Sequence, residues 1–556
     1  MIDERSGGQI LVDALCQQGS SHVFCVPGES YLPILDALFD ERSIQTVVCR
    51  QEGGAAMMAD AYGKLTHQPG ICFVTRGPGA TNAAAGVHIA AQDSTPLILF
   101  VGQVSRTAAG REAFQEVDYR LMFGSLAKSV EQIEEPSRIP EVVSRAFHIA
   151  TNGRAGPVVI ALPEDMLSEK ARVADTGSYQ QVEAAPDMAG VRKLGNLLRS
   201  ASRPLVIIGG RGWLLDTWKS FQRFVSDWDL PVATAYRYQD SFDNSLDHYI
   251  GDVGIGINPR LGAAIRDADL LLAIGIRLGE VTTSGYSLIN VPMPTQHLVH
   301  VYPGMEELGR VYRADLAINA GPNAFTTALL EIELLSKPRW SNWRQQLRKY
   351  YLEWSEPQSN PGDLQLGEVV RSLRIELPPD AVIANGAGNY TAWLHRHHCY
   401  RFLGSQLGPT SGSMGYGLPG AIASKLLQPE RTTIAFAGDG CFLMTGQEMA
   451  TAVQYQLPLI VILINNGIYG TIRMHQEMRY PGRVSGTNLV NPDFCRLASA
   501  YGAHAERVEK TVEFIPALRR ALAENKPSLI ELVIDPDAIS PNQTLRHIRA
   551  AAQRKA

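Results

Sequence analysis

The chain has 556 residues, 45% of them hydrophobic and 19% charged, and a formal net charge of −5 at pH 7. This composition is that of a globular protein with a large core, and the length predicts about three domains. The negative charge argues against a nucleic-acid-binding protein. The seven cysteines are widely spaced and include no Cys-x-x-Cys pair, so they indicate neither a disulfide scaffold nor a zinc site.

The first residues and the hydropathy of the chain bear on its location. Met1–Arg5 has neither the basic nor the apolar part of a secretory leader. No apolar run reaches the length of a membrane span. We therefore expect a cytoplasmic protein.

Strand-like and helix-like patterns alternate along the chain, which predicts an α/β protein of mainly parallel sheets flanked by helices. Two polar stretches with little periodicity, 168–190 and 356–363, divide the chain into thirds. We predict an N-terminal domain at 1–170, a central Rossmann-like domain at 190–345 and a C-terminal domain at 360–545. The first and last are expected to share a similar doubly wound sheet.

The first third contains a glutamate between a strand and a helix. Thr46–Cys49 is typical of a strand and Ala55–Leu65 of a helix, with Glu52 between them. Taken alone, Glu52 is best explained as an ordinary helix N-terminal residue, where the helix dipole favours a negative charge.

The central third has two apolar strands, Pro204–Ile208 and Asp269–Ile274, each followed by a glycine turn. Such turns can bind a nucleotide diphosphate. A tight turn after a buried strand is the commoner reason for glycine at these places.

The last third carries the most informative pattern. Ile434–Ala437 predicts a buried strand that ends in a Gly-Asp-Gly turn containing Asp439. Thr445–Glu448 has the form of a capping box that starts a helix. Leu459–Ile464 predicts the next parallel strand, which ends in an Asn-Asn-Gly turn containing Asn466.

The ends of two neighbouring parallel strands would bring Asp439 and Asn466 together. Their oxygen atoms are the ligands that a hard cation such as Mg²⁺ prefers. Because these groups cannot fill an octahedral shell, we expect water and a phosphate-bearing ligand to complete it.

This pair of turns resembles the diphosphate–magnesium motif of thiamine diphosphate (ThDP) enzymes, and the resemblance covers nearly the whole chain. It implies Asp439, Asn466 and the main-chain oxygen of Ile468 as metal ligands. It also implies Glu52 as the acid that activates the aminopyrimidine ring of ThDP, in an apolar setting that keeps a proton available.

Other segments follow in the order of this family. Val23–Glu29, Thr75–Asn82 and Gly156–Pro163 resemble the first strand and turn, the glycine loop and the last strand of the pyrimidine-binding domain. In the diphosphate-binding domain, Gly386–Asn389 resembles a loop beside the diphosphate, and Ser411–Gly415 resembles the segment that grips the pyrimidine.

Within the last segment, Met414 would be the prop that bends the cofactor, and the Gly412 oxygen would accept a hydrogen bond from its amino group. The resemblance implies a set of cofactor-binding residues made of Gly28, Glu52, Gly79, Asn82, Gly386, Gly388, Asn389, Gly412, Met414, Gly438, Asp439, Gly440, Asn466, Ile468, Tyr469 and Gly470.

Among ThDP enzymes the motifs are most similar to the acetohydroxyacid (acetolactate) synthase group. Gly102–Arg106, Ala113–Glu116 and Lys128 carry this resemblance. The pyruvate-type decarboxylases have paired histidines near the Ala113–Glu116 position, and none occur there. The resemblance implies decarboxylation of a pyruvate-like 2-oxoacid and transfer of the acyl carbanion to a second carbonyl compound. Its candidate catalytic residues are Glu52, Gln115, Lys128 and His475.

Three residues depart from the synthase pattern or lack a clear role. Arg76 stands where the synthases have a small residue. Two interpretations of Arg76 have equal weight, a substrate contact and a structural salt bridge. His475 lies near the usual place of a tryptophan, so both a proton donor and a partly exposed helix residue remain open. His88 is expected to pack in a helix. Arg76 and His475 motivate the alternative of a decarboxylase or C–C lyase acting on a larger substrate.

The resemblance also implies ThDP, Mg²⁺ and a homo-oligomer as partners of the chain. Glu52 of one chain would meet the diphosphate motif of another, so a homodimer is the minimum and a homotetramer is common. FAD is not favoured, because the strand His300–Pro303 lacks the acidic residue that flavin-containing synthases show. A cofactor-binding protein without catalysis is a third hypothesis, which the presence of Glu52, Asp439 and Asn466 opposes.

Overall fold

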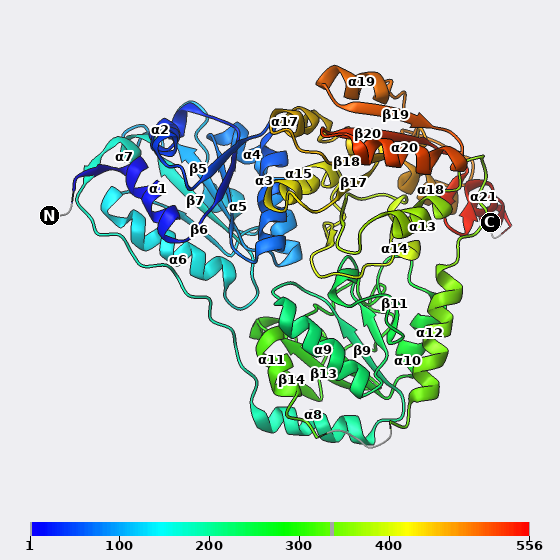
Figure 1. The fold of residues 1–556 in the computed structure, drawn as a ribbon. Helices are drawn as coiled ribbons and strands as arrows, with labels where there is room; N and C mark the ends of the chain where they lie inside the picture. The colour runs from blue at the N-terminus through cyan, green and yellow to red at the C-terminus, as the bar shows by residue number, and fades with distance from the viewer. Residues whose placement is uncertain (1–2, 334–337, 555–556) are drawn as a thin grey trace.

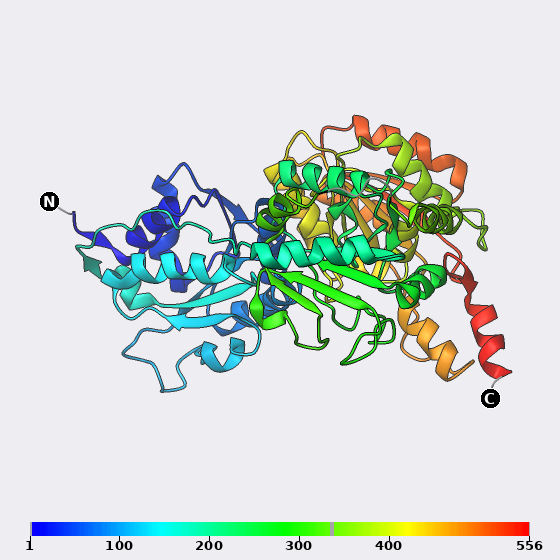
Figure 2. The ribbon, with the colours of Figure 1, turned by 90° about the horizontal axis from the view of Figure 1, so that it is seen from below.

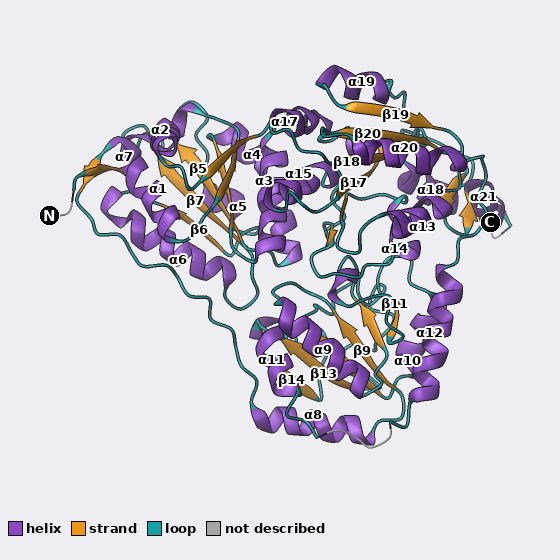
Figure 3. Cartoon of the chain, viewed as in Figure 1, coloured by secondary structure: helices purple, strands orange, loops and turns teal. Residues whose placement is uncertain are grey.

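The computed structural model describes residues 3–333 and 338–554. Within them the chain forms three six-stranded parallel sheets flanked by helices, which confirms the predicted fold class (Figures 1 and 3). Figure 1 shows the first domain, in blue and cyan, beside the last, in yellow to red, with the central domain in green below them. The domain boundaries themselves stay predictions.

The N-terminal sheet has helices on both faces because alternate side chains of its strands point to opposite sides. Ile98 and Phe100 pack on one side, and Leu97, Leu99 and Val101 on the other. In sheet order the strands are β3 (Gln45–Val48), β2 (His22–Cys25), β4 (Gly70–Val74), β5 (Leu97–Gln103), β7 (Pro157–Pro163) and β6 (Ser129–Gln132). The main helices are α1 (Gly7–Gln17), α2 (Leu32–Asp40) and α6 (Ile139–Thr151) on one face, and α3 (Glu52–Thr66) and α4 (Gly77–Asp93) on the other.

The central sheet has the first and fourth strands of its domain in the middle, with the second and third added on one side and the fifth and sixth on the other, which is the Rossmann order. In sheet order its strands are β11 (Tyr249–Asp252), β10 (Val232–Thr234), β9 (Pro204–Ile208), β12 (Leu270–Ile274), β13 (His297–Tyr302) and β14 (Leu316–Asn319). The flanking helices are α8 (Met188–Ser200), α9 (Leu215–Asp227), α10 (Pro259–Asp267), α11 (Pro322–Leu329) and α12 (Ser341–Ser355).

The C-terminal sheet repeats the strand order of the N-terminal sheet, as expected for two similar doubly wound domains. In sheet order its strands are β16 (Gln406–Leu407), β15 (Val382–Asn385), β17 (Thr433–Gly438), β18 (Ile460–Asn465), β20 (Ser528–Val533) and β19 (His504–Val508). Its helices are α13 (Leu366–Glu376), α14 (Thr391–His397), α15 (Gly417–Leu427), α16 (Asp439–Phe442), α17 (Met449–Gln454), α18 (Gly470–Arg479), α19 (Phe494–Tyr501), α20 (Thr511–Ala523) and α21 (Leu545–Gln553).

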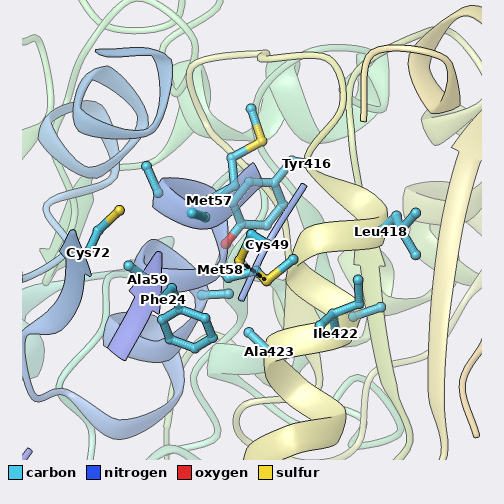
Figure 4. Packing of buried hydrophobic residues seen from close by; sticks show 14 of the residues in the cluster. Phe24, Cys49, Met57, Met58, Ala59, Cys72, Tyr416, Leu418, Ile422 and Ala423 are labelled. Carbon is cyan, nitrogen blue, oxygen red and sulfur yellow. Dashed lines mark hydrogen bonds between the residues drawn. The ribbon is translucent and has the colours of Figure 1, made fainter. Parts of the chain in front are cut away.

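The N- and C-terminal domains share one hydrophobic core. Helix α3 packs against α15, and Met58 and Ile422 belong to the same buried cluster (Figure 4).

Helices α18 and α21 lie side by side at the edge of the C-terminal domain (Figure 2). The ion pair of Glu477 and Arg549 joins them. In the described part of the chain, no helix combines the length and hydropathy that crossing a membrane requires.

Two local predictions are wrong. The glycine-rich segment 77–82 is not a loop, because α4 starts at Gly77 with Pro78 in its first turn, a position that suits proline. The residues 445–448 do not form a capping box. Thr445 donates its hydroxyl to the Gly415 carbonyl instead, and a short 3₁₀ helix (Gly446–Glu448) precedes α17.

Candidate active site

Asp439 and Asn466 lie together, as predicted, because they follow paired strands. Gly438 of β17 is opposite Ile464 of β18 in parallel register, so the chain leaves both strands at the same edge of the sheet. The Asp439 carboxylate accepts hydrogen bonds from the N–H groups of Gly440 at 2.8 Å and Gly467 at 2.9 Å. These two bonds fix the carboxylate toward the end of β18.

A cavity of about 250 Å³ opens at this edge of the C-terminal sheet. Its apolar lining includes Ile464, Ile534 and Ile539. Most of the cofactor-binding residues predicted in this domain line it, namely Gly388, Asn389, Gly412, Met414, Gly438, Asp439, Gly440, Asn466, Ile468, Tyr469 and Gly470. Gly386 lies just behind the lining, where a Cβ atom would stand only 2.3 Å from Cys441 Sγ.

The groups in this cavity fit a magnesium ion with a phosphate-bearing ligand. Asp439 and Asn466 offer carboxylate and amide oxygens, the donor types that Mg²⁺ prefers. Burial raises the pKa of Asp439, and hydrogen bonds from its neighbours oppose this rise. A cation next to Asp439 would favour the charged carboxylate. Helix α18 begins at Gly470 on the cavity lining, so its N-terminal N–H groups suit an anion.

Asn491 is a site residue that the sequence did not reveal. Its Nδ2 donates to Asp439 at 2.8 Å and to Asn465 at 2.9 Å, so it orients the proposed metal ligand from outside the cavity. Asn491 lies 25 residues beyond Asn466, in a segment without regular periodicity. The sequence carries no signal that could have placed it.

Glu52 is the first residue of α3, at the carboxyl edge of the N-terminal sheet. Asn82, in the second turn of α4, donates a hydrogen bond of 2.9 Å to Glu52 Oε2. A Cβ atom at Gly79 would lie 3.5 Å from Glu52 Oε1, and one at Gly28 would lie 2.5 Å from Thr75 Cβ. The structure therefore brings Glu52, Gly79 and Asn82 into one cluster, with Gly28 on the adjacent turn.

This Glu52 cluster and the C-terminal cavity do not meet within one chain. All residues that line the cavity lie between Ala387 and Ile539, so the first domain contributes none of them. One chain thus carries two separate half-sites, each at the carboxyl edge of its own sheet.

The other candidate residues of the first domain lie in different surroundings. Gln115 is near the Glu52 edge, where its carbonyl accepts a hydrogen bond of 3.0 Å from Gly77 at the start of α4. Arg76 is buried, and its guanidinium group pairs with Glu29 and Glu164. Of the two interpretations of Arg76, the geometry favours the structural salt bridge.

Lys128, a candidate catalytic residue by resemblance, lies away from Glu52. It precedes β6 at the amino edge of the sheet, where its ammonium group donates to the carbonyls of Ile149 and Asn152. Glu52 lies at the opposite, carboxyl edge. The structure therefore does not bring Lys128 to Glu52, and its contacts explain it as a residue that holds the end of α6.

The two histidines also differ from expectation. His88 is exposed on α4 rather than packed. His475 is exposed on α18 and is not among the residues that line the cavity, although Ile472 of the same helix is. The exposed position of His475 corresponds to the simpler of its two interpretations.

A larger cavity of about 950 Å³ lies between the first and central domains. The glycine turns after β9 and β12 line it, together with Arg154, Arg211 and Arg277. These arginines have acidic partners, since Arg211 contacts Asp240 at 3.0 Å and Arg277 contacts Glu307 at 3.7 Å.

Comparison with known proteins agrees with this architecture. Residues 5–122, 191–329 and 386–532 match, in turn, the N-terminal TPP binding domain, the central domain and the C-terminal TPP binding domain of thiamine pyrophosphate enzymes. Thiamine pyrophosphate (TPP) is another name for ThDP.

Full-length relatives are similar to nearly the whole chain. The acetolactate synthase isozyme 2 large subunit of Escherichia coli K12 is 30% identical over 536 residues, which cover 95% of this chain and 96% of the relative. The acetolactate synthase large subunit of Corynebacterium glutamicum is 30% identical over 555 residues, covering 96% and 88%. The probable acetolactate synthase large subunit of Methanocaldococcus jannaschii is 30% identical over 557 residues, covering 96% and 93%. The chain therefore belongs to the thiamine pyrophosphate enzyme family and is an acetolactate synthase-like member of it.

Proposed function

We propose that the protein is a ThDP- and Mg²⁺-dependent transferase that decarboxylates pyruvate or a similar 2-oxoacid and joins the remaining acyl unit to a second carbonyl compound. The observation that carries this proposal is the position of Asp439 and Asn466 on the lining of a cavity of about 250 Å³. When bound, ThDP supplies the electron sink for the loss of CO₂.

The chain's own residues have defined tasks in this proposal. Asp439, Asn466 and the Ile468 main-chain oxygen would hold Mg²⁺, whose positive charge would favour binding of the diphosphate. Met414 and Gly412 bind the middle of the cofactor. The apolar lining of the cavity excludes water from the reacting centre.

Glu52 holds a proton at its carboxyl group for ring atom N1′ of the aminopyrimidine. The 2.9 Å hydrogen bond from Asn82 fixes Oε2, which leaves Oε1 as the oxygen that would bond to the ring. Gln115, at the same edge of the sheet, is the remaining candidate for a substrate contact.

The active site is proposed to form between two copies of the chain. The Glu52 cluster of one copy would face the cavity of the other, and the reverse arrangement would build a second site. Large apolar side chains beside both half-sites support this proposal, because a monomer leaves them in water. Phe114, next to Gln115, is 74% exposed, and Ile472, on the cavity lining, is 55% exposed. A dimer is the smallest such assembly, and a tetramer of two dimers has the same sites.

Two further features of the proposal are tested separately. FAD is not favoured in the cavity of about 950 Å³. An absorption spectrum of the purified protein tests this prediction, because an oxidised flavin absorbs between about 350 and about 500 nm. The cytoplasmic location stays a prediction.

Product analysis tests the proposed reaction. Purified protein is incubated with ThDP, Mg²⁺ and pyruvate, alone and with other 2-oxoacids or aldehydes, and the products are identified by mass. A 2-hydroxyketone product that requires both ThDP and Mg²⁺ is the expected result. Release of a free aldehyde without hydroxyketone would contradict the transferase. Turnover of a bulkier acid with pyruvate inert would favour the alternative decarboxylase or lyase acting on a larger substrate.

A further inference from the structure

Three charged side chains form a buried ion cluster where the first and last domains pack together. Lys64 of α3 lies 2.7 Å from Asp60 on the same helix and 2.5 Å from Asp93 at the end of α4. The three side chains are at most 1% exposed. Burying two carboxylates and one ammonium group costs free energy unless further hydrogen bonds satisfy them.

Further hydrogen bonds come from the C-terminal domain and reach one oxygen of Asp60 and one of Asp93, while Asp60 Oδ1 has no partner among the described residues. The Tyr416 hydroxyl donates to Asp60 at 2.7 Å, and Lys64 donates to that hydroxyl at 3.3 Å. The Thr410 N–H donates to Asp93 Oδ1 at 2.8 Å, and its hydroxyl donates to the same oxygen. Figure 4 shows Tyr416 at the start of α15 with its ring directed toward Met57 and Met58 of α3.

Thr410 and Tyr416, which make these hydrogen bonds, are the two ends of one loop, residues 410–416. Gly412 and Met414, which line the cavity of about 250 Å³, lie between them. Gly412 and Gly415 have φ angles of 70° and 87°, so the loop depends on residues that are conformationally free in the unfolded chain. A loop of this kind needs fixed ends to hold one conformation.

We propose that the buried ion cluster of Asp60, Lys64 and Asp93 is a positioning device, which fixes both ends of the 410–416 loop so that Gly412 and Met414 are oriented for the cofactor before it binds. This inference rests on the proposed role of Gly412 and Met414 in binding ThDP. Asp60, Lys64 and Asp93 are not among the residues that line the cavity of about 250 Å³, and they act through Tyr416 and Thr410.

The charged residues are poor targets for the test, because removing one would leave buried charges unpaired and unfold the protein. Tyr416→Phe and Thr410→Val each keep the shape of the side chain and remove only the hydroxyl that reaches the cluster. Tyr238→Phe is the matched control. It also removes a partly buried hydroxyl, which donates to the main-chain oxygen of Asp93 at 3.1 Å, and among the described residues no hydrogen bond joins this hydroxyl to the 410–416 loop.

The measurement is a ThDP titration at saturating Mg²⁺, followed by the change in intrinsic tryptophan fluorescence, to which Trp393 on the cavity lining contributes. Thermal unfolding of the cofactor-free protein is measured alongside. Tyr416→Phe and Thr410→Val are each expected to raise the dissociation constant of ThDP about tenfold, the size of one lost charge-assisted hydrogen bond. Tyr238→Phe is expected to leave the dissociation constant of ThDP unchanged, although it shifts Tm by about as much as the two loop variants do.

Wild-type affinity in both loop variants would overturn the inference, and so would an equal loss of affinity in Tyr238→Phe, which would indicate general destabilisation. Met414→Ala separates this inference from the proposed site. If it weakens ThDP binding while the loop variants do not, the site stands and the positioning role falls. If Met414→Ala binds ThDP normally, the site assignment is wrong and the inference fails with it.

Discussion

The carboxylate of Glu448, in the C-terminal domain, accepts a hydrogen bond of 3.0 Å from the main-chain N–H of Gln51, in the N-terminal domain. It also accepts one of 3.1 Å from the N–H of Arg50. Gly54 permits this approach, because a Cβ atom there would lie 2.6 Å from Glu448 Oε1. Glu448 is fully buried and thus fixes the segment that directly precedes Glu52.

We predict that Glu448→Leu lowers kcat about tenfold, because it removes the oxygen that accepts from the N–H groups of Arg50 and Gln51, and Glu52 then loses its fixed orientation. Steady-state kinetics at saturating ThDP checks this. Thr451→Val is the matched control, since Thr451 donates to the other oxygen of the same carboxylate without contacting the segment before Glu52. Equal losses in both variants would show that Glu448 serves stability alone.

For Glu52→Gln we predict a loss of turnover of at least about 100-fold, the usual contribution of a positioned acid or base, with ThDP still bound. Turnover and the cofactor-dependent circular dichroism are the two readouts. Glu29→Gln is the control at the same sheet edge, because Glu29 is exposed and contacts Arg76 rather than Asn82. Full turnover by the Glu52 variant would show that the assignment of Glu52 is wrong.

Replacing Asp439 by Asn removes the only charge that the chain offers among the three proposed metal ligands. We predict that the apparent dissociation constant for Mg²⁺ at saturating ThDP rises at least about tenfold, because a neutral amide binds a hard cation more weakly than a carboxylate does. Titration of activity with Mg²⁺ measures it. Asp493→Asn, which changes an exposed residue that caps α19, should leave the Mg²⁺ titration as in the wild type. An unchanged titration in the Asp439 variant would remove it from the metal site.

Buried histidines in and after α14 predict that the protein loses stability in acid. Burial lowers the pKa of His395 and His398 to about 3 and that of His397 to about 4, and nearby arginines lower them further. In the unfolded chain a histidine takes up a proton below about pH 6.5. In the folded protein the same three histidines stay neutral until the pH approaches their lowered pKa values. Stability is therefore complete above about pH 6.5 and is lost as the pH falls, by about 2 kcal/mol for each such histidine at about pH 5.

Thermal unfolding between about pH 7 and pH 4.5 tests this pH dependence. His395→Phe keeps a ring against Tyr236 and should reduce the loss of Tm in acid. His88→Gln, at an exposed position on α4, should leave the loss as large as in the wild type. The same acid sensitivity in His395→Phe and the wild type would contradict the explanation.

The sequence predicted the parts of the site that strand order and local pattern determine. Asp439 and Asn466 follow apolar strands of clear period, and neighbouring parallel strands end at one edge, so their meeting could be inferred. Glu52 follows the same logic in the first domain. By contrast, Thr445 has the local form of a cap, but its hydroxyl bonds to Gly415, a tertiary contact that no local pattern reveals.

Lys128 shows a second limit of sequence reasoning. Its place in the chain order resembled that of a catalytic residue, yet it precedes a strand and so lies at the amino edge of the sheet. Asn491, Glu448 and the buried ion cluster act through contacts between segments far apart in the chain. Such contacts depend on how the domains pack, and a single sequence does not carry that information.

The most direct test of the account is complementation between two inactive variants. Glu52→Gln and Asp439→Asn chains with different affinity tags are mixed, allowed to exchange subunits and assayed, with doubly tagged dimers isolated to prove exchange. If each active site combines Glu52 of one copy with Asp439 of another, a mixed dimer contains one intact site, and an equal mixture recovers about a quarter of the wild-type activity. Activity no greater than that of the separate variants, with mixed dimers present, would contradict a site shared between two chains.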